Sequence, residues 1–181
     1  AVLGDAFLQA VQLVAGASSV LCIGAELSSA AVARLTAGML TKFAVRAVAE
    51  DHPSEQRALV EVADPGTVLF VVSYRGANER LVDLTTTARS RGLAAISLTN
   101  NAGSPLARAS DVSLLTGGPI LFDDPSARRI GARSAQFALA RALAEAVGAH
   151  RAAQAVPTAQ RAAPQTPRTA APAVPPRTQH P

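Results

Sequence analysis

Short apolar runs alternate with segments of mixed polarity along the first 148 residues of the chain. Each run has the length of a strand and is almost continuously apolar, as in TVLFVV. Continuous runs of this kind are typical of strands that are buried on both faces, as in parallel sheets. The pattern predicts strands at residues 20–23, 45–48, 67–72, 94–98 and 112–115.

The segments between these runs carry apolar residues at three- and four-residue spacing, which predicts amphipathic helices. Strict alternation of strand and helix favours parallel strands joined by crossover helices that cover both faces. We therefore expect an α/β fold, a doubly wound five-stranded parallel sheet in three α/β/α layers with the flavodoxin-like strand order 2-1-3-4-5. The expected helices are residues 2–15, 28–41, 54–62, 78–91 and 127–147.

The composition changes near residue 148. The chain has 181 residues, 49% of them hydrophobic, which is enough for one core and hence one domain, expected at residues 1–148. Seven of the 12 prolines follow His150, mixed with Ala, Gln, Thr and Arg. Such a segment buries too little apolar surface to offset its ordering entropy, so residues 149–181 are expected to form a disordered tail. It is either an inert extension or a flexible arm that touches nucleic acid.

The high pI of the sequence suggests nucleic-acid binding, but the distribution of charge along the chain does not support this. All 13 acidic residues and 13 of the 17 basic residues precede position 151, so the body is formally neutral and the net charge of +4 comes from the tail. The sequence pI of about 10.5 therefore predicts no basic face on the fold.

Several site classes are disfavoured by residue content. One cysteine, Cys22, allows no disulfide framework, and three histidines with one cysteine do not suggest a metal site. The dinucleotide pattern G-x-G-x-x-G and the nucleotide pattern G-x-x-x-x-G-K are both missing. We expect no cofactor, no metal and no membrane contact, and a cytoplasmic location, since no apolar run approaches the ~18 residues that span a bilayer.

The clearest candidate for chemistry is the loop Ser73-Tyr-Arg-Gly-Ala-Asn78 after the third expected strand. Gly76 permits a tight turn, and the first N–H groups of the next helix lack partners and carry the positive end of its dipole. Ser73, Arg75 and Asn78 could then bind a phosphate, with Asn78 capping the helix or touching the ligand. The alternative is an ordinary strand-to-helix turn with a solvated arginine.

A similar loop follows the first expected strand. Gly24 allows the turn, and Ser28 or Ser29 is expected to cap the next helix. In the order 2-1-3-4-5 the first and third strands are neighbours, so the two serine-bearing loops would converge on one cleft. This convergence favours an anion site over two unrelated turns.

Three segments resemble the SIS (sugar isomerase) domain, and most closely the effector domain of RpiR-type transcription regulators. They are SYRGANER at 73–80, SLTNNAGSPLARASDVSLLTG at 97–117 and RSAQFALARAL at 133–143, and the resemblance covers residues 1–148. It implies a phosphosugar-binding domain that dimerises and, in the regulators, performs no chemistry.

The family motifs match at some positions and depart at others. The family's phosphate loop, usually S-x-S-G-x-T, matches at Ser73 and Gly76, with Asn78 for the threonine and Arg75 for the second serine. The first loop, usually G-x-G-x-S, matches at Gly24 and Ser28. Glu26 stands where the second glycine is usual, and its carboxylate would repel a phosphate unless Arg75 or another cation pairs with it.

An isomerase would need a general base in the cleft, and the chain offers few candidates. His52 follows the second expected strand, where regulators of this type often have a histidine, so a ligand contact is one reading and a surface helix cap the other. Glu79 fits better as a favourable charge in the first turn of a helix. Only Glu26 or His52 could serve as the base, so binding is favoured over catalysis.

Three hypotheses follow. The favoured one is the sensor domain of an RpiR-type regulator that binds a sugar phosphate or amino-sugar phosphate and forms a homodimer or higher homo-oligomer. It would contact DNA only through a helix-turn-helix outside this chain. The alternatives are an aldose–ketose phosphosugar isomerase and a degenerate SIS fold retained for dimerisation.

Overall fold

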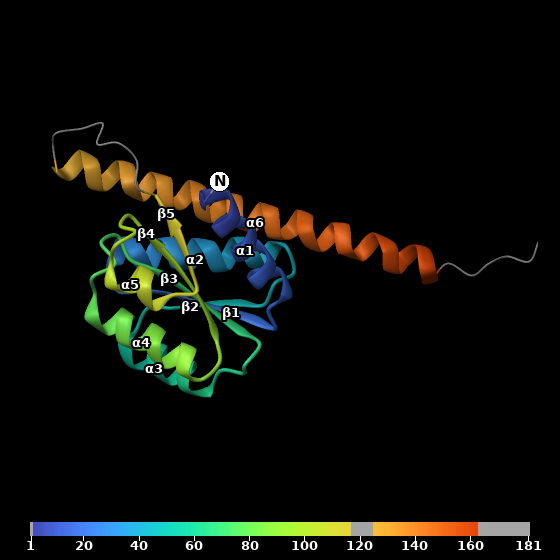
Figure 1. Cartoon of the computed structure of the whole chain (residues 1–181), viewed down its shortest axis with the longest axis horizontal. Helices are drawn as coiled ribbons and strands as arrows, with labels where there is room; N and C mark the ends of the chain where they lie inside the picture. Colours follow the sequence, from blue (N-terminus) through green and yellow to red (C-terminus); the bar gives the residue numbers. More distant parts are fainter. Residues whose placement is uncertain (1, 117–124, 163–181) are drawn as a thin grey trace, which may run out of the picture.

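The fold is known from a computed structural model that describes residues 2–116 and 125–162. Helices and strands alternate along the chain, as the hydrophobic pattern predicts (Figure 1). In chain order the elements are α1 Val2–Gly16, β1 Ser19–Gly24, α2 Leu27–Lys42, β2 Ala47–Glu50, α3 Pro53–Val62, β3 Thr67–Val72, α4 Glu79–Ser90, β4 Ala94–Thr99, α5 Pro105–Ala109, β5 Val112–Leu115 and α6 Pro125–Ala162.

The strands form one five-stranded sheet in the order β2-β1-β3-β4-β5, with every neighbouring pair parallel. The predicted fold class and strand order are therefore confirmed. The order places β1 beside β3, with Gly24 opposite Val72 at the carboxyl ends of the two strands.

Alternate residues of the central strands pack into two separate apolar layers. On one face Val20, Cys22 and Phe70 pack with α1, α2 and α6, and on the other Leu21 and Leu69 pack with α3, α4 and α5. Figure 1 shows α2 and α6 on one side of the strands and α3 and α4 on the other. Burial on both faces explains why the strands read as continuous apolar runs rather than alternating ones.

The structure differs from the expected boundaries in the second strand. Residue 45 was expected to begin that strand, but β2 starts at Ala47 because Val45 belongs to the turn that closes α2. The Val45 amide donates to the carbonyl of Leu40 at 3.1 Å, and the Val45 side chain is buried.

The short helix α5 was not predicted. Ser104 caps it, accepting from the amide of Ala107 at 3.2 Å, and Pro105 takes the first helical position. Serine followed by proline is a recognised helix start.

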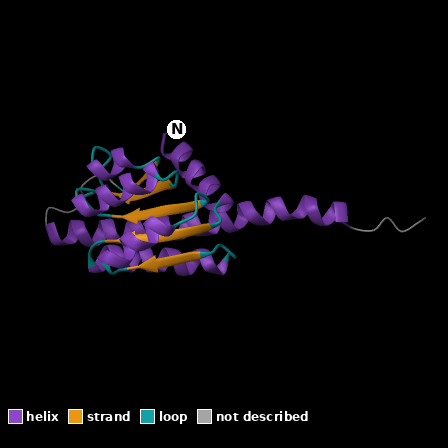
Figure 2. Cartoon of the chain, turned by 90° about the horizontal axis from the view of Figure 1, so that it is seen from below, coloured by secondary structure: helices purple, strands orange, loops and turns teal. Residues whose placement is uncertain are grey.

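The closing helix was expected to end at residue 147, but α6 continues to Ala162. Ala, Gln and Arg dominate residues 149–155, and these are strong helix formers. The continuation projects away from the sheet in both views (Figures 1 and 2). Residues 149–162 of the expected tail are thus helical, and residues 163–181 lie outside the described part of the chain. Within that part, no helix combines the length and the apolar character needed to cross a membrane.

The packing of α4 against the sheet can be tested with a pair of matched substitutions. Leu81 is fully buried in the layer between α4 and the sheet, whereas Leu8 on α1 is 60% exposed. We expect Leu81→Ala to lower the free energy of unfolding by about 2 to 5 kcal/mol and Leu8→Ala by about 0.5 kcal/mol or less, as measured by urea denaturation. Equal losses would contradict this packing.

Candidate ligand-binding site

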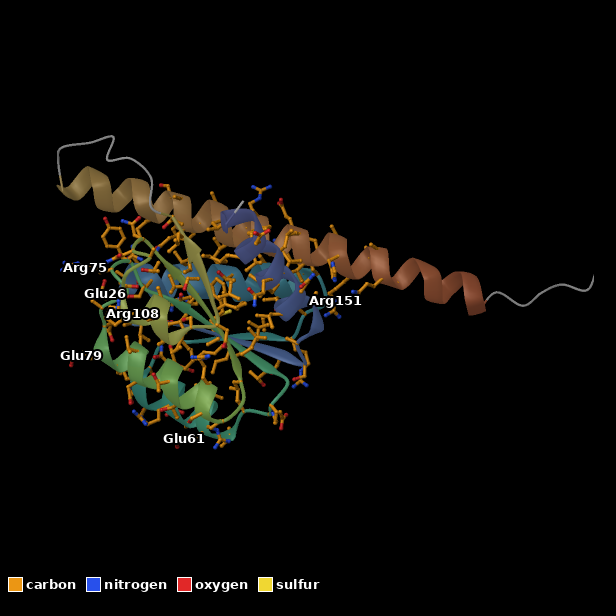
Figure 3. All side chains as sticks on the ribbon, in the orientation of Figure 1. Glu26, Glu61, Arg75, Glu79, Arg108 and Arg151 are labelled. Carbon is orange, nitrogen blue, oxygen red and sulfur yellow. The ribbon has the colours of Figure 1, made fainter. Side chains whose placement is uncertain are left out.

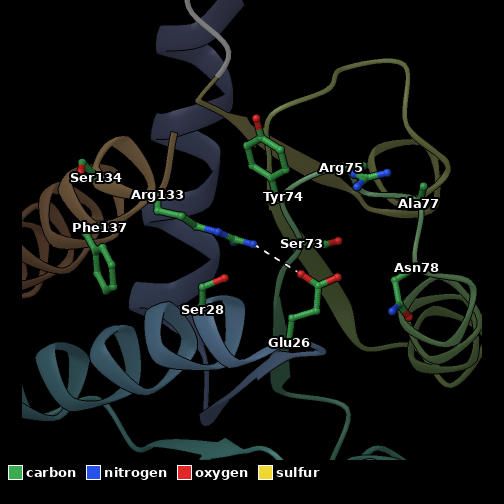
Figure 4. Close-up of a pocket in the computed structure, with 10 residues that line it drawn as sticks. All are labelled: Glu26, Ser28, Ser73, Tyr74, Arg75, Ala77, Asn78, Arg133, Ser134 and Phe137. Atoms are coloured by element: carbon green, nitrogen blue, oxygen red, sulfur yellow. Dashed lines mark ion pairs between the residues drawn. The ribbon is translucent and has the colours of Figure 1, made fainter. Parts of the chain in front are cut away.

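The loops that follow β1 and β3 lie side by side, because these strands are neighbours and both end at the same edge of the sheet. Between them is a cleft of about 780 Å³ whose wall is completed by α6 (Figure 4). The sequence analysis expected Ser28 and Ser73 to converge, and both line this cleft. The lining residues are Glu26, Ser28, Ser73, Tyr74, Arg75, Ala77, Asn78, Arg133, Ser134 and Phe137.

The loop after β3 is held by the last residue of β4 and by the segment that follows it. The carbonyl of Tyr74 accepts from the amide of Asn100 at 3.0 Å and from the hydroxyl of Thr99 at 3.2 Å. The carbonyl of Gly76 accepts from the amide of Leu106 at 2.9 Å. These bonds fix the backbone of the loop before any ligand arrives.

Gly76 is required at its position for two reasons. Its φ of +65° is in the left-handed region, and a Cβ placed there would lie 2.2 Å from the Oγ of Ser104 and 2.9 Å from the Oγ1 of Thr99. Gly76 itself does not line the cleft, so its part in the site is to shape the loop.

Asn78 and the N-terminus of α4 form the far end of the cleft. The Oδ1 of Asn78 accepts from the amide of Leu81 at 3.1 Å, which makes Asn78 the N-cap that the sequence suggested. Asn78 also lines the cleft, as does the exposed Arg75. The positive end of the α4 dipole and one guanidinium therefore lie at the same end of the cavity.

The loop after β1 lacks the serine cap that the sequence predicted for the next helix. A Cβ on Gly24 would lie 2.5 Å from the carbonyl carbon of Ser29, so glycine lets the strand end approach α2 closely. The predicted cap by Ser28 or Ser29 is wrong, because α2 starts at Leu27 with Glu26 at the N-cap position and without a side-chain cap bond. Ser28 is exposed on the cleft wall, and Ser29 is buried beneath it.

A buried glutamine braces this first loop from below. The Nε2 of Gln56 donates to the carbonyl of Gly24 at 3.1 Å and to that of Glu50 at 2.7 Å. Its Oε1 accepts from Arg80 at 2.6 Å. The ends of β1 and β2 are thereby tied to α3 and α4.

Arg133 is a charged residue of the cleft that the sequence analysis missed, and Tyr74, Ala77, Ser134 and Phe137 also line the cleft without having been predicted. It reaches the cleft from α6, with its guanidinium 3.0 Å from the Oγ of Ser29, 2.8 Å from the Oε1 of Gln136 and 5.3 Å from the ring centroid of Tyr74. Burial lowers the pKa of Arg133, and the nearby Glu26 opposes this shift. The sequence placed Arg133 on a helix but gave no sign that this helix crosses the mouth of the cleft.

Glu26, whose carboxylate would otherwise repel a phosphate, is paired with a cation. Its carboxylate lies 3.7 Å from the guanidinium of Arg133 (dashed line in Figure 4), and the partner is thus not Arg75. Figure 3 shows Glu26 and Arg75 at one end of the molecule, with Arg151 far along α6.

His52 lies elsewhere. It is exposed at the start of α3, its Nδ1 is 2.8 Å from the Oγ of Ser54, and it is not among the residues that line the cleft. Its predicted ligand contact stays a prediction. Of the other predicted site residues, Ser28, Ser73, Arg75 and Asn78 line the cleft, and Gly24, Ser29 and Gly76 shape its walls.

No group of three or more His, Cys, Asp or Glu side chains within residues 2–116 and 125–162 is arranged to hold a metal ion. Cys22 is fully buried in the sheet, and burial raises the pKa of its thiol far above the usual range. Its role is packing.

Comparison with known proteins agrees with this geometry. The sequence profile of the SIS domain matches residues 13–146. The chain belongs to the SIS domain family. The match includes β1 to β5 and the part of α6 that carries Arg133.

Two curated relatives of this SIS domain are HTH-type transcriptional regulators by name. The HTH-type transcriptional regulator HexR of Pseudomonas aeruginosa is 37% identical over 87 residues, which is 48% of this chain and 30% of that protein. The HTH-type regulator TTE0211 of Caldanaerobacter subterraneus is 45% identical over 49 residues, 27% of this chain and 17% of that protein. The matches thus span less than a third of either regulator.

Solved structures share the SIS fold at lower identity. The sugar isomerase domain of an RpiR transcription factor from Sphaerobacter thermophilus superposes with a TM-score of 0.70 at 21% identity, covering 87% of this chain and 84% of that one. NanR of Vibrio vulnificus, complexed with ManNAc-6P, gives 0.67 at 23% identity and 89% and 62% coverage. The phosphoheptose isomerase GmhA of Neisseria gonorrhoeae gives 0.68 at 20% identity and 82% and 88% coverage.

The two demands on Gly76 can be separated by substitution. Gly92→Ala tests positive φ alone, because Gly92 has φ +84° and open space around its missing Cβ. We expect Gly92→Ala to cost about 1 to 2 kcal/mol of folding free energy, and Gly76→Ala to cost more because it adds the clash with Ser104. Thermal and urea unfolding measure both, and equal costs would contradict the close contact described here.

Proposed function

We propose that this chain is the phosphosugar-sensing effector domain of an RpiR-type transcription regulator. The observation that carries the proposal is the convergence of Ser28, Ser73, Arg75 and the Asn78-capped start of α4 on one cleft. Hydroxyls, a guanidinium and the positive end of a helix dipole together suit a phosphate.

The regulator part of the proposal draws on the relatives. Two regulators with HTH-type names align with this chain over only part of their own lengths, which suits a chain that holds the effector part. The DNA-binding helix-turn-helix would belong to another part of the protein, and the ligand would act by changing how a homodimer or higher homo-oligomer presents it. The setting of such a regulator is the cytoplasm.

The residues of the cleft favour ligand binding over isomerase activity. Its described lining contains a single carboxylate, Glu26, and no histidine, and Glu26 is paired with Arg133. A general base that moves protons between sugar carbons must lie within hydrogen-bond reach of them, and Glu26 is the one described lining carboxylate that could act as such a base. A coupled assay for ketose formation, run on the same phosphosugars, would expose an isomerase.

The proposal is tested by thermal unfolding with a panel of sugar phosphates and amino-sugar phosphates. A ligand present at 100 times its Kd stabilises the folded chain by about 2.7 kcal/mol. For a domain of this size we expect a rise in Tm of roughly 5 to 10 °C with at least one panel member. No shift with any of them would favour a fold retained only for dimerisation.

Matched variants locate the binding. Ser73→Ala and Arg75→Ala should each weaken binding by roughly tenfold, because each removes a hydrogen bond to a charged group. Ser90→Ala and Arg91→Ala, at the opposite end of α4, should leave the Kd unchanged. Similar losses from all four variants would indicate nonspecific attraction.

A further inference from the structure

The charge of Arg133 is poorly compensated for a side chain so well covered. Its side chain is 15% exposed, and its two close hydrogen-bond acceptors, Ser29 and Gln136, are neutral. A guanidinium removed from water is stable only when an anion offsets its charge. Glu26 supplies the anion, but at 3.7 Å, beyond the range of a good charge-assisted hydrogen bond.

The two partners of this ion pair differ in how firmly they are held. Arg133 is fixed by Ser29, by Gln136 and by the ring of Tyr74. The side chain of Glu26 is 72% exposed and stands at the N-cap position of α2 without a cap bond. The cation is therefore positioned in advance, and the carboxylate can swing into solvent at little cost.

The orientation of Arg133 leaves a neighbouring buried side chain, Gln136, with a hydrogen-bond donor that is unpaired within the described part of the chain. Gln136 is fully buried and turns its oxygen toward Arg133, which leaves its Nε2 without a hydrogen-bond partner among the described residues. A buried unpaired donor is unfavourable and uncommon. The arrangement keeps the guanidinium aimed into the cleft, where Figure 4 shows it pointing toward Glu26 and Ser73.

We propose that Arg133 is an anion-binding residue of the cleft and that Glu26 is a built-in counter-ion which the ligand displaces from it. The inference rests on the proposed function. It adds Arg133 as a ligand-binding residue and a competition between Glu26 and the ligand for that arginine. A ligand must bring an anionic group that binds Arg133 better than an exposed carboxylate at 3.7 Å does. The cleft therefore selects for negative charge at the α6 wall.

The anionic group could be the phosphate itself or a second acid on the ligand. Glucose 6-phosphate and 6-phosphogluconate separate these sources, since they share the phosphate and only the second carries a carboxylate at C1. The titrations use both, together with the panel member that gives the largest thermal shift.

A double-mutant cycle distinguishes competition from simple repulsion. Glu26→Gln should tighten binding by roughly threefold to fivefold, the range expected for an exposed ion pair. If Glu26 acts by occupying Arg133, this gain disappears in an Arg133→Met background. If Glu26 only repels the ligand, the gain is the same in both backgrounds.

Three controls accompany the cycle. Arg133→Met alone should weaken binding by about tenfold or more through loss of a charged hydrogen bond. Arg133→Lys keeps the charge and should retain part of the coupling, which covers the case in which the methionine variant unfolds. Glu55→Gln, in the exposed first turn of α3, removes one negative charge away from the cleft and should change nothing.

The results of the cycle show whether the inference alone fails or the proposed function fails with it. A gain in the wild-type background that is lost with Arg133→Met supports the inference, and the responding probe identifies the anionic group. Equal gains in both backgrounds, or no gain while Ser73→Ala still weakens binding, overturn the inference and leave the proposed function standing. If no panel member binds the wild-type chain, the proposed function fails and this inference fails with it.

Discussion

The site depends on one constraint, the pairing of β1 with β3 at the centre of the sheet. Their register sets Gly24 opposite Val72, so the loops that follow leave the sheet at the same level and in adjacent positions. Ser28 follows β1 and Ser73 follows β3, so this pairing brings the two serines to one cavity. The crossover through β2 and α3 is what allows strands that are not consecutive in sequence to become neighbours.

The paired strands alone would not make a binding site, because loops at a sheet edge are free to move unless something holds them. Here each loop is tied down by a segment from elsewhere in the chain. The Tyr74 and Gly76 carbonyls accept hydrogen bonds from the end of β4 and the segment after it, and the Gly24 carbonyl accepts one from Gln56 of α3. These bonds go to backbone carbonyls and use none of the side-chain hydroxyls of Ser28 and Ser73, which line the cavity. A site organised in this way spends less binding energy on ordering itself when a ligand arrives.

The sequence predicted the fold well because its signals are local and repeated. The apolar runs at 67–72 and 94–98 have the length of strands, and the helical segments between them predict parallel connections. The errors fall where long-range packing overrides a local signal. Val45 has the character of a strand residue but packs in the turn after α2, and Ser28 has the character of a cap but lies two residues after the N-cap position, which Glu26 occupies. The length of α6 was underestimated because prolines further on outweighed the alanines in the reading of residues 149–155.

The site was predictable to the extent that it lies on loops of the sheet, and not where a distant helix contributes to it. Ser73, Arg75 and Asn78 follow a strand directly, so their place at its end could be read from the chain. Arg133 lies 104 residues from its partner Ser29, and no periodicity in α6 indicates which of its polar residues faces a cavity. This omission explains why Glu26 seemed an obstacle to phosphate binding: its charge was visible in the sequence and its counter-charge was not. Among the described residues that line the cleft are two guanidiniums and one carboxylate, and this balance of charge favours an anion.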